Sequence, residues 1–191
     1  MKKSNYITLA FIAIATVFIG CNDQGGESNG ALSSNAAERV YVEPGKYDEF
    51  YAFLSGGFSG QLAVYGIPSG RLLKVVPVFS QDPEKAYGYN EETKPMLNTT
   101  HGFIPWDDTH HPDMSQTDGV LDGRWIFMNG NNTPRVARVD LTTFETAEIM
   151  EIPNSAGNHS SAFVTENTEY VIAGTRFAVP IPPEGYAHQG L

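Results

Sequence analysis

The chain has 191 residues, a net charge of −10 and 41% hydrophobic residues, with 19 glycines and 12 prolines. This composition predicts one turn-rich, β-dominated domain and excludes a disordered chain. Because the sequence contains no basic patch, nucleic acid is not expected as a partner. The one cysteine, Cys21, excludes disulfides and thiolate metal sites within the chain.

The N-terminal residues have the pattern of an export signal. Lys2 and Lys3 precede an apolar run over residues 7–19, which is too short to span a bilayer and typical of a signal peptide. Residues 18–21, Phe-Ile-Gly-Cys, resemble a bacterial lipoprotein cleavage box with Cys21 as the lipidated residue. We therefore predict an exported, periplasmic protein with a lipid anchor as its only membrane attachment. In the alternative interpretation, Cys21 is a spare thiol in a cleaved peptide.

Three segments follow from this pattern. Residues 1–20 are predicted to be a lipoprotein-type signal peptide. Residues 21–38 are rich in Asn, Gly, Ser and Ala without apolar periodicity, which predicts a flexible tether. Residues 39–191 are predicted to form an incomplete β-propeller domain.

Short apolar segments separated by turn residues run through this domain. The predicted strands are residues 40–42, 61–65, 72–79, 122–128, 135–140, 146–152, 161–165 and 170–174, with turns at 44–45, 67–70 and 141–145. A shift of 74 residues superposes the hairpin at 61–79 on that at 135–152. Repeated small antiparallel sheets are typical of a β-propeller, with a β-sandwich as the alternative. Residues 80–118 are predicted to be a long functional loop without regular structure, ordered against a partner surface by its aromatic residues.

A candidate metal site lies at residues 106–113, Trp-Asp-Asp-Thr-His-His-Pro-Asp. Neutral imidazole is the commonest metal ligand, although an isolated His-His pair is more often part of a polar turn. His159 follows His111 by 48 residues, about one propeller blade, so the rings of His110, His111 and His159 could converge on the propeller axis.

The spacing of these residues restricts the geometry. Adjacent residues on a regular strand point to opposite faces, so His110 and His111 can bind one ion only if the backbone bends, or else they bind two ions of a cluster. We expect Pro112 to hold His111 extended. Asp108 lies two residues before His110 and is placed to accept a hydrogen bond from its ring. Ligation by imidazole alone suits copper or zinc, and the affinity order favours copper.

Several motifs together resemble one family. They are Asp-Thr-His-His-Pro at 108–112, Thr-Asp-Gly at 117–119, Asp-Gly-Arg at 122–124, Arg-Val-Ala-Arg at 135–138 and Gly-Asn-His at 157–159. With further matches over residues 39–182, in unbroken order, the chain resembles nitrous oxide reductase. The signal segment lacks an Arg-Arg pair and so is similar to the Sec-exported branch of that family.

The resemblance implies a seven-bladed propeller that holds a tetranuclear copper-sulfide cluster on seven histidines. His110, His111 and His159 match three of these ligands, and Asp108 matches the aspartate that orients a ligand ring. The implied reaction is the two-electron reduction of nitrous oxide to dinitrogen and water. The implied partners are an electron donor such as a c-type cytochrome and a second subunit in a homodimer. His101 and His188 match no ligand and are expected to be ordinary loop histidines.

The resemblance also bears on the extent of the chain. Four cluster ligands and the domain with a dinuclear copper site are expected beyond Leu191, so this chain is expected to be an N-terminal fragment that is inactive alone. Two alternatives remain. One is a non-catalytic, lipid-anchored propeller that binds a partner protein or polymer. The other is a mononuclear zinc hydrolase on the same histidines, with Asp107 or Asp113 as the base.

Overall fold

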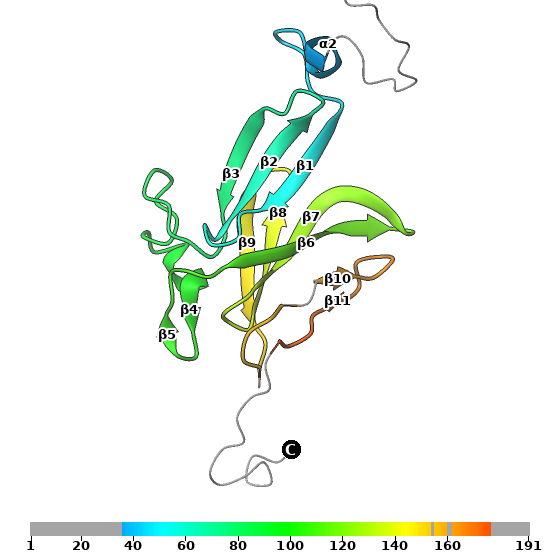
Figure 1. Ribbon diagram of the computed structural model, residues 1–191. Helices are drawn as coiled ribbons and strands as arrows, with labels where there is room; N and C mark the ends of the chain where they lie inside the picture. Colours follow the sequence, from blue (N-terminus) through cyan, green and yellow to red (C-terminus); the bar gives the residue numbers. More distant parts are fainter. Residues whose placement is uncertain (1–35, 154, 160–161, 177–191) are drawn as a thin grey trace, which may run out of the picture. The chain divides into compact units, whose positions relative to one another are not determined.

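The computed structural model describes residues 36–153, 155–159 and 162–176 (Figure 1). The predicted signal peptide, Cys21, most of the predicted tether and His188 therefore lie outside the described residues. The chain divides into two units, residues 1–39 and 40–191. Neither α2 (Ala36–Val40) nor the 3-10 turn η1 (Lys94–Leu97), the helices of the described ranges, is long and apolar enough to cross a membrane.

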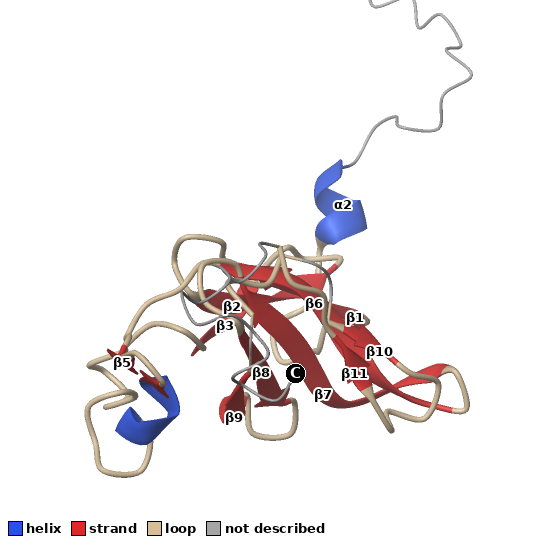
Figure 2. Cartoon of the chain, turned by 90° about the horizontal axis from the view of Figure 1, so that it is seen from below, coloured by secondary structure: helices blue, strands red, loops and turns tan. Residues whose placement is uncertain are grey.

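The second unit is built from antiparallel sheets (Figure 2). The first has three strands in the order β1 (Phe50–Ser55), β2 (Gln61–Ile67) and β3 (Leu72–Pro77). The second has four strands in the order β6 (Thr109–Thr117), β7 (Val120–Gly130), β8 (Arg135–Asp140) and β9 (Glu145–Glu151). Two short hairpins complete the unit: β4 (Asn98–Thr99) with β5 (Gly102–Phe103), and β10 (Phe163–Val164) with β11 (Val171–Ile172).

The 74-residue repeat is a repeat of strand register. Leu62 pairs with Val76 in the first sheet, and Val136 pairs with Met150 in the second, so both members of the pair are displaced by the same shift. The register also slips at the same point in the two hairpins, between Val64 and Tyr65 and between Arg138 and Val139. The two hairpins are therefore equivalent units of one repeated architecture.

The equivalent strands bury opposite faces. In β2 the buried positions are Leu62 and Val64, whereas in β8 they include Ala137 and Val139, one residue out of phase with the repeat. Side chains alternate between the two faces of a strand. When two sheets of the same design stack front to back, they meet through opposite faces, so the buried positions differ by one residue. One core joins both sheets: Leu62, Val76, Val78, Phe79, Ile126, Met128, Ala137 and Val139. The predicted all-β class is confirmed, and the stacked sheets are consistent with consecutive propeller blades.

Two predictions about the positions of strands were wrong. Residues 40–42 are not a strand, because α2 ends at Val40 and the next two residues are irregular. Residues 109–117, predicted to be part of an irregular loop, form β6. This strand was missed because it buries polar rather than apolar side chains. The Thr109 hydroxyl donates to the Gln61 carbonyl at 3.0 Å, and the Ser115 hydroxyl accepts from the Trp125 amide at 2.9 Å.

Candidate metal centre

The histidine pair sits at a bulge in β6. His110 pairs with Asn129 and Asp113 pairs with Phe127, so two residues, His111 and Pro112, oppose one residue of β7. Such a bulge bends the strand and redirects side chains. His111 has φ +43°, in the left-handed region, so the expectation that Pro112 holds it extended was wrong. The bulge removes the strict alternation that would separate adjacent side chains, and the two rings lie 5.4 Å apart.

The third histidine comes from the loop after β9. This loop is held by backbone hydrogen bonds from Asn158 to the Gly130 carbonyl at 3.2 Å and from Arg176 to the Gly157 carbonyl at 3.0 Å. The Asn129 side-chain amide also donates to the Asn158 carbonyl. As a result, the His159 ring lies 4.7 Å from that of His110 and 5.0 Å from that of His111. One nitrogen from each of the three rings lies within 4.8 Å of the others.

Asp108 lies behind the first ring. Its Oδ2 is 2.9 Å from Nε2 of His110, and it also accepts a 2.9 Å hydrogen bond from the Asn131 side chain. When Nε2 carries the ring proton, it donates to Oδ2 and leaves Nδ1 for a metal. Asp108 is only 3% exposed, and its Oδ1 has no hydrogen-bond partner among the described residues. The carboxylate therefore contacts the ring from the buried side.

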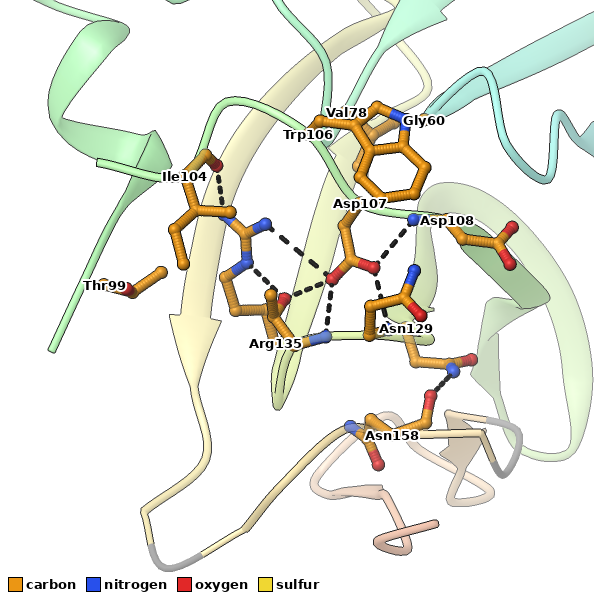
Figure 3. A network of polar contacts seen from close by, with 12 residues as sticks. Gly60, Val78, Thr99, Ile104, Trp106, Asp107, Asp108, Asn129, Arg135 and Asn158 are labelled. Carbon is orange, nitrogen blue, oxygen red and sulfur yellow. Dashed lines mark hydrogen bonds and ion pairs between the residues drawn. The ribbon is translucent and has the colours of Figure 1, made fainter. Parts of the chain in front are cut away.

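The other two carboxylates of the motif are structural. Asp107 is fully buried, and Figure 3 shows its carboxylate between Arg135 and the backbone of Asp108. Its oxygens accept hydrogen bonds from the amides of Asp108, Asn132 and Thr133 at 2.7, 2.8 and 2.9 Å. The Asp113 oxygens accept from the amides of Met114 and Val164, at 3.0 and 2.9 Å. Since these oxygens are already held by amide donors, neither carboxylate is placed to act as the base of a zinc hydrolase.

The electrostatic environment favours a neutral ring at His159. Partial burial lowers the pKa of His159 below its ordinary value of 6.5, and positive charge on His110, Arg176 and His111 lowers it further, against the opposing effect of Asp108. Only the neutral form has a lone pair to give to a metal. The site is thus biased toward the ligand form of this side chain at neutral pH.

The spacing and chemistry of the three rings fit a metal with imidazole ligands. Nitrogen donors on one tetrahedral ion lie roughly 3.3 Å apart. The limit of 4.8 Å between the ring nitrogens therefore fits one ion after a small inward rotation of the rings, or adjacent ions of a cluster. Two rings are half-buried and His111 is exposed, so the group is open to a ligand.

Residues outside the histidine motif also contribute. The segments that carry Asp108 and the three histidines are also contacted by Asn129, Asn131, Asn158 and Arg176, which the sequence did not identify. The polar run Asn-Gly-Asn-Asn at 129–132, directly after an apolar strand, was the available signal. His101 is exposed in the β4–β5 turn and is not part of the cluster of three.

A cavity elsewhere in the second unit is separate from this site. It has a volume of about 510 Å³ and is lined by residues that include Trp125, Met150 and Tyr170, but by none of the three clustered histidines. Arg138 lies 4.5 Å from the Trp125 ring and forms a 3.0 Å ion pair with Glu148. The cavity is therefore lined in part by this ion pair and contains none of the three histidines.

Fold and site together define a class: an all-β, propeller-type protein with a candidate metal centre of three imidazoles. No protein-family model matches the chain. Four curated relatives are named nitrous-oxide reductase. The Pseudomonas fluorescens protein is 35% identical over 94% of this chain and 28% of its own length. The proteins of Stutzerimonas stutzeri and Cupriavidus necator are 32% and 30% identical, over 91% and 92% of this chain.

The chain is therefore related to nitrous-oxide reductase over nearly its whole length, as the sequence motifs indicate. It spans only 27 to 30% of the length of these three relatives.

Proposed function

We propose that the chain supplies three ligands of the copper centre of a nitrous-oxide reductase. The reaction is the reduction of nitrous oxide by two electrons and two protons to dinitrogen and water. The observation that carries the proposal is the convergence of His110, His111 and His159, whose ring nitrogens lie within 4.8 Å of one another. The activity is proposed from the relatives, which are named nitrous-oxide reductase.

The side chains have separate roles in this proposal. Copper bound here would supply electrons to a substrate that is otherwise inert. The three rings would hold the metal, and Asp108 would fix the tautomer and orientation of His110 through the 2.9 Å contact. The bulge at His111 and Pro112 allows two consecutive residues to serve the same centre. Because the ring nitrogens lie within 4.8 Å of one another, they can bind adjacent ions, and a tetranuclear copper-sulfide cluster is the form of the centre that we propose from the resemblance.

Copper analysis of the complete protein tests this assignment. We expect the wild-type protein to retain copper after dialysis, and His110→Ala, His111→Ala and His159→Ala each to lose copper and nitrous oxide reduction. His101→Ala is the matched control, because this exposed histidine lies outside the cluster. Retention of the full copper content by the three cluster variants would contradict the proposal.

We also propose that the protein is exported to the periplasm and anchored through a lipid on Cys21. The support is the apolar run at residues 7–19 followed by the cleavage-box pattern. Cys21→Ser should move the protein from the membrane fraction to the soluble fraction without changing its copper content. A membrane-bound Cys21→Ser variant would contradict lipidation.

The partners proposed from the resemblance are a second subunit and an electron donor such as a c-type cytochrome. The net charge of −10 supports attraction of a positively charged donor through long-range electrostatics. A rate of electron transfer that falls with ionic strength would agree with this, whereas a rate independent of salt would argue against electrostatic guidance.

A further inference from the structure

Asn131 forms a buried polar bridge beside the candidate metal centre. It lies between β7 and β8 and is 8% exposed. Its side-chain amide donates to Oδ2 of Asp108 at 2.9 Å, and its backbone amide donates to the Asp108 carbonyl at 2.8 Å. Its side-chain oxygen accepts a 2.7 Å hydrogen bond from the Arg176 guanidinium. All of these contacts are long-range in sequence.

The two ends of this bridge reach different ligand-bearing segments. On one side, Asp108 contacts the His110 ring at 2.9 Å. On the other, the Arg176 backbone amide donates to Gly157 at 3.0 Å, two residues before His159. Asn131 therefore connects the start of β6 to the loop after β9.

The loop that carries Asn131 is fixed from the opposite side. Asp107 accepts hydrogen bonds from the amides of Asn132 and Thr133, which follow Asn131 directly, and it lies 3.7 Å from Arg135. Both charged side chains of this ion pair are fully buried, and Figure 3 shows the contact between them. The position of Asn131 is therefore set by the protein frame rather than by the histidines.

We propose that Asn131 is a positioning residue that sets the orientation of His110 relative to His159, acting through Asp108 and Arg176. The proposal rests on the assignment of a copper centre to these histidines. Because Asn131 and His110 share one oxygen of Asp108, the carboxylate cannot rotate without losing a buried hydrogen bond. The ring that this carboxylate holds is fixed in turn, and partners of this kind tune metal affinity.

The test compares Asn131→Asp with Asn132→Asp in the complete copper-loaded protein. The first substitution keeps the shape of the side chain but replaces the donor to Asp108 with a carboxylate oxygen. The second adds the same charge at the next residue, which is exposed. We expect Asn131→Asp to weaken copper binding by roughly 10- to 100-fold in a chelator competition and to change the copper absorption and EPR spectra. Asn132→Asp should leave both unchanged.

The outcomes separate this proposal from the copper assignment. If Asn131→Asp has the affinity and spectra of Asn132→Asp, or changes only the melting temperature, the positioning role is wrong while the copper centre stands. If the histidine variants keep their copper, the copper assignment itself fails. Should Asn131→Asp not accumulate, Arg176→Gln removes the other end of the bridge without adding a charge beside Asp108. It should change the copper spectra in the same way, and unchanged spectra would overturn the proposal.

Discussion

The two stacked sheets share one hairpin design, but only the second carries the candidate site. Strands β2–β3 and β8–β9 repeat each other in register and in the position of their irregularity. The second sheet has a further strand, β6, whose bulge presents His110 and His111. At the equivalent positions, 74 residues earlier, stand Ala36 and Ala37 of α2. Among the described residues, β1 has no strand on its other edge.

The comparison indicates that the repeated strands form the fold, whereas segments outside the repeat carry the candidate site. The core between the sheets depends on the repeated strands. The histidines, Asp108 and Asn131 lie on a bulge and on loops that the repeat does not specify. Stability and metal binding should therefore respond to different substitutions.

The largest loss of stability is expected from breaking the buried ion pair between Asp107, which precedes β6, and Arg135 on β8. Asp107→Ala removes the carboxylate that forms the ion pair with the fully buried Arg135, which should lower the free energy of unfolding by about 3–5 kcal/mol. Urea denaturation measures this, with Glu91→Ala as the control at an exposed carboxylate. Equal midpoints for the two variants would show that the pair does not stabilise the fold.

Next in size is a substitution in the core between the sheets. Leu62 is fully buried against the second sheet, whereas Leu73 on β3 is 44% exposed. Leu62→Ala should lower the free energy of unfolding by about 2–5 kcal/mol, and Leu73→Ala should change it by no more than about 0.5 kcal/mol. Similar losses in thermal or urea unfolding would contradict the front-to-back packing of the sheets.

The bulge predicts that glycine and alanine have opposite effects on stability at His111 and His110. At His111, with φ +43°, glycine should be more stable than alanine by about 1 kcal/mol. At His110, which pairs with Asn129 in the ladder, alanine should be more stable than glycine by roughly 0.5–1 kcal/mol. Unfolding of the four single variants without metal gives both differences. The same order at both positions would argue against the bulge.

The smallest effect concerns two aspartates at equivalent positions of the 74-residue repeat, Asp48 and Asp122. Burial alone would raise the pKa of Asp48, but hydrogen bonds from Ser69 and Arg71 lower it overall. A hydrogen bond from Arg124 lowers the pKa of Asp122. A lowered pKa stabilises the fold above the ordinary aspartate pKa, and this stabilisation is lost as the pH falls through the folded value. Asp48→Asn and Asp122→Asn should therefore reduce the fall in melting temperature between neutral and acid pH, and an unaltered fall would contradict these contacts.

The sequence predicted the hairpins well because turn residues separate their apolar segments, and the first strand of each hairpin alternates between more and less buried side chains. Residues 135–140 were predicted and observed as a strand with the same bounds. β6 was missed because its buried side chains are polar, and no apolar pattern marks it. The three histidines were identified from spacing and motif, but the left-handed conformation of His111 depends on the partner strand. Asn131 and Arg176 could not be predicted, because 45 residues separate them and only the folded chain brings them into contact.

Anomalous scattering at the copper absorption edge, from crystals of the complete copper-loaded protein, tests the central claim most directly. We predict copper peaks at bonding distance from ring nitrogens of His110, His111 and His159, with Asp108 on the far side of the His110 ring. Copper found only elsewhere, with these three rings hydrogen-bonded to protein groups, would contradict the assignment of this cluster as a metal centre.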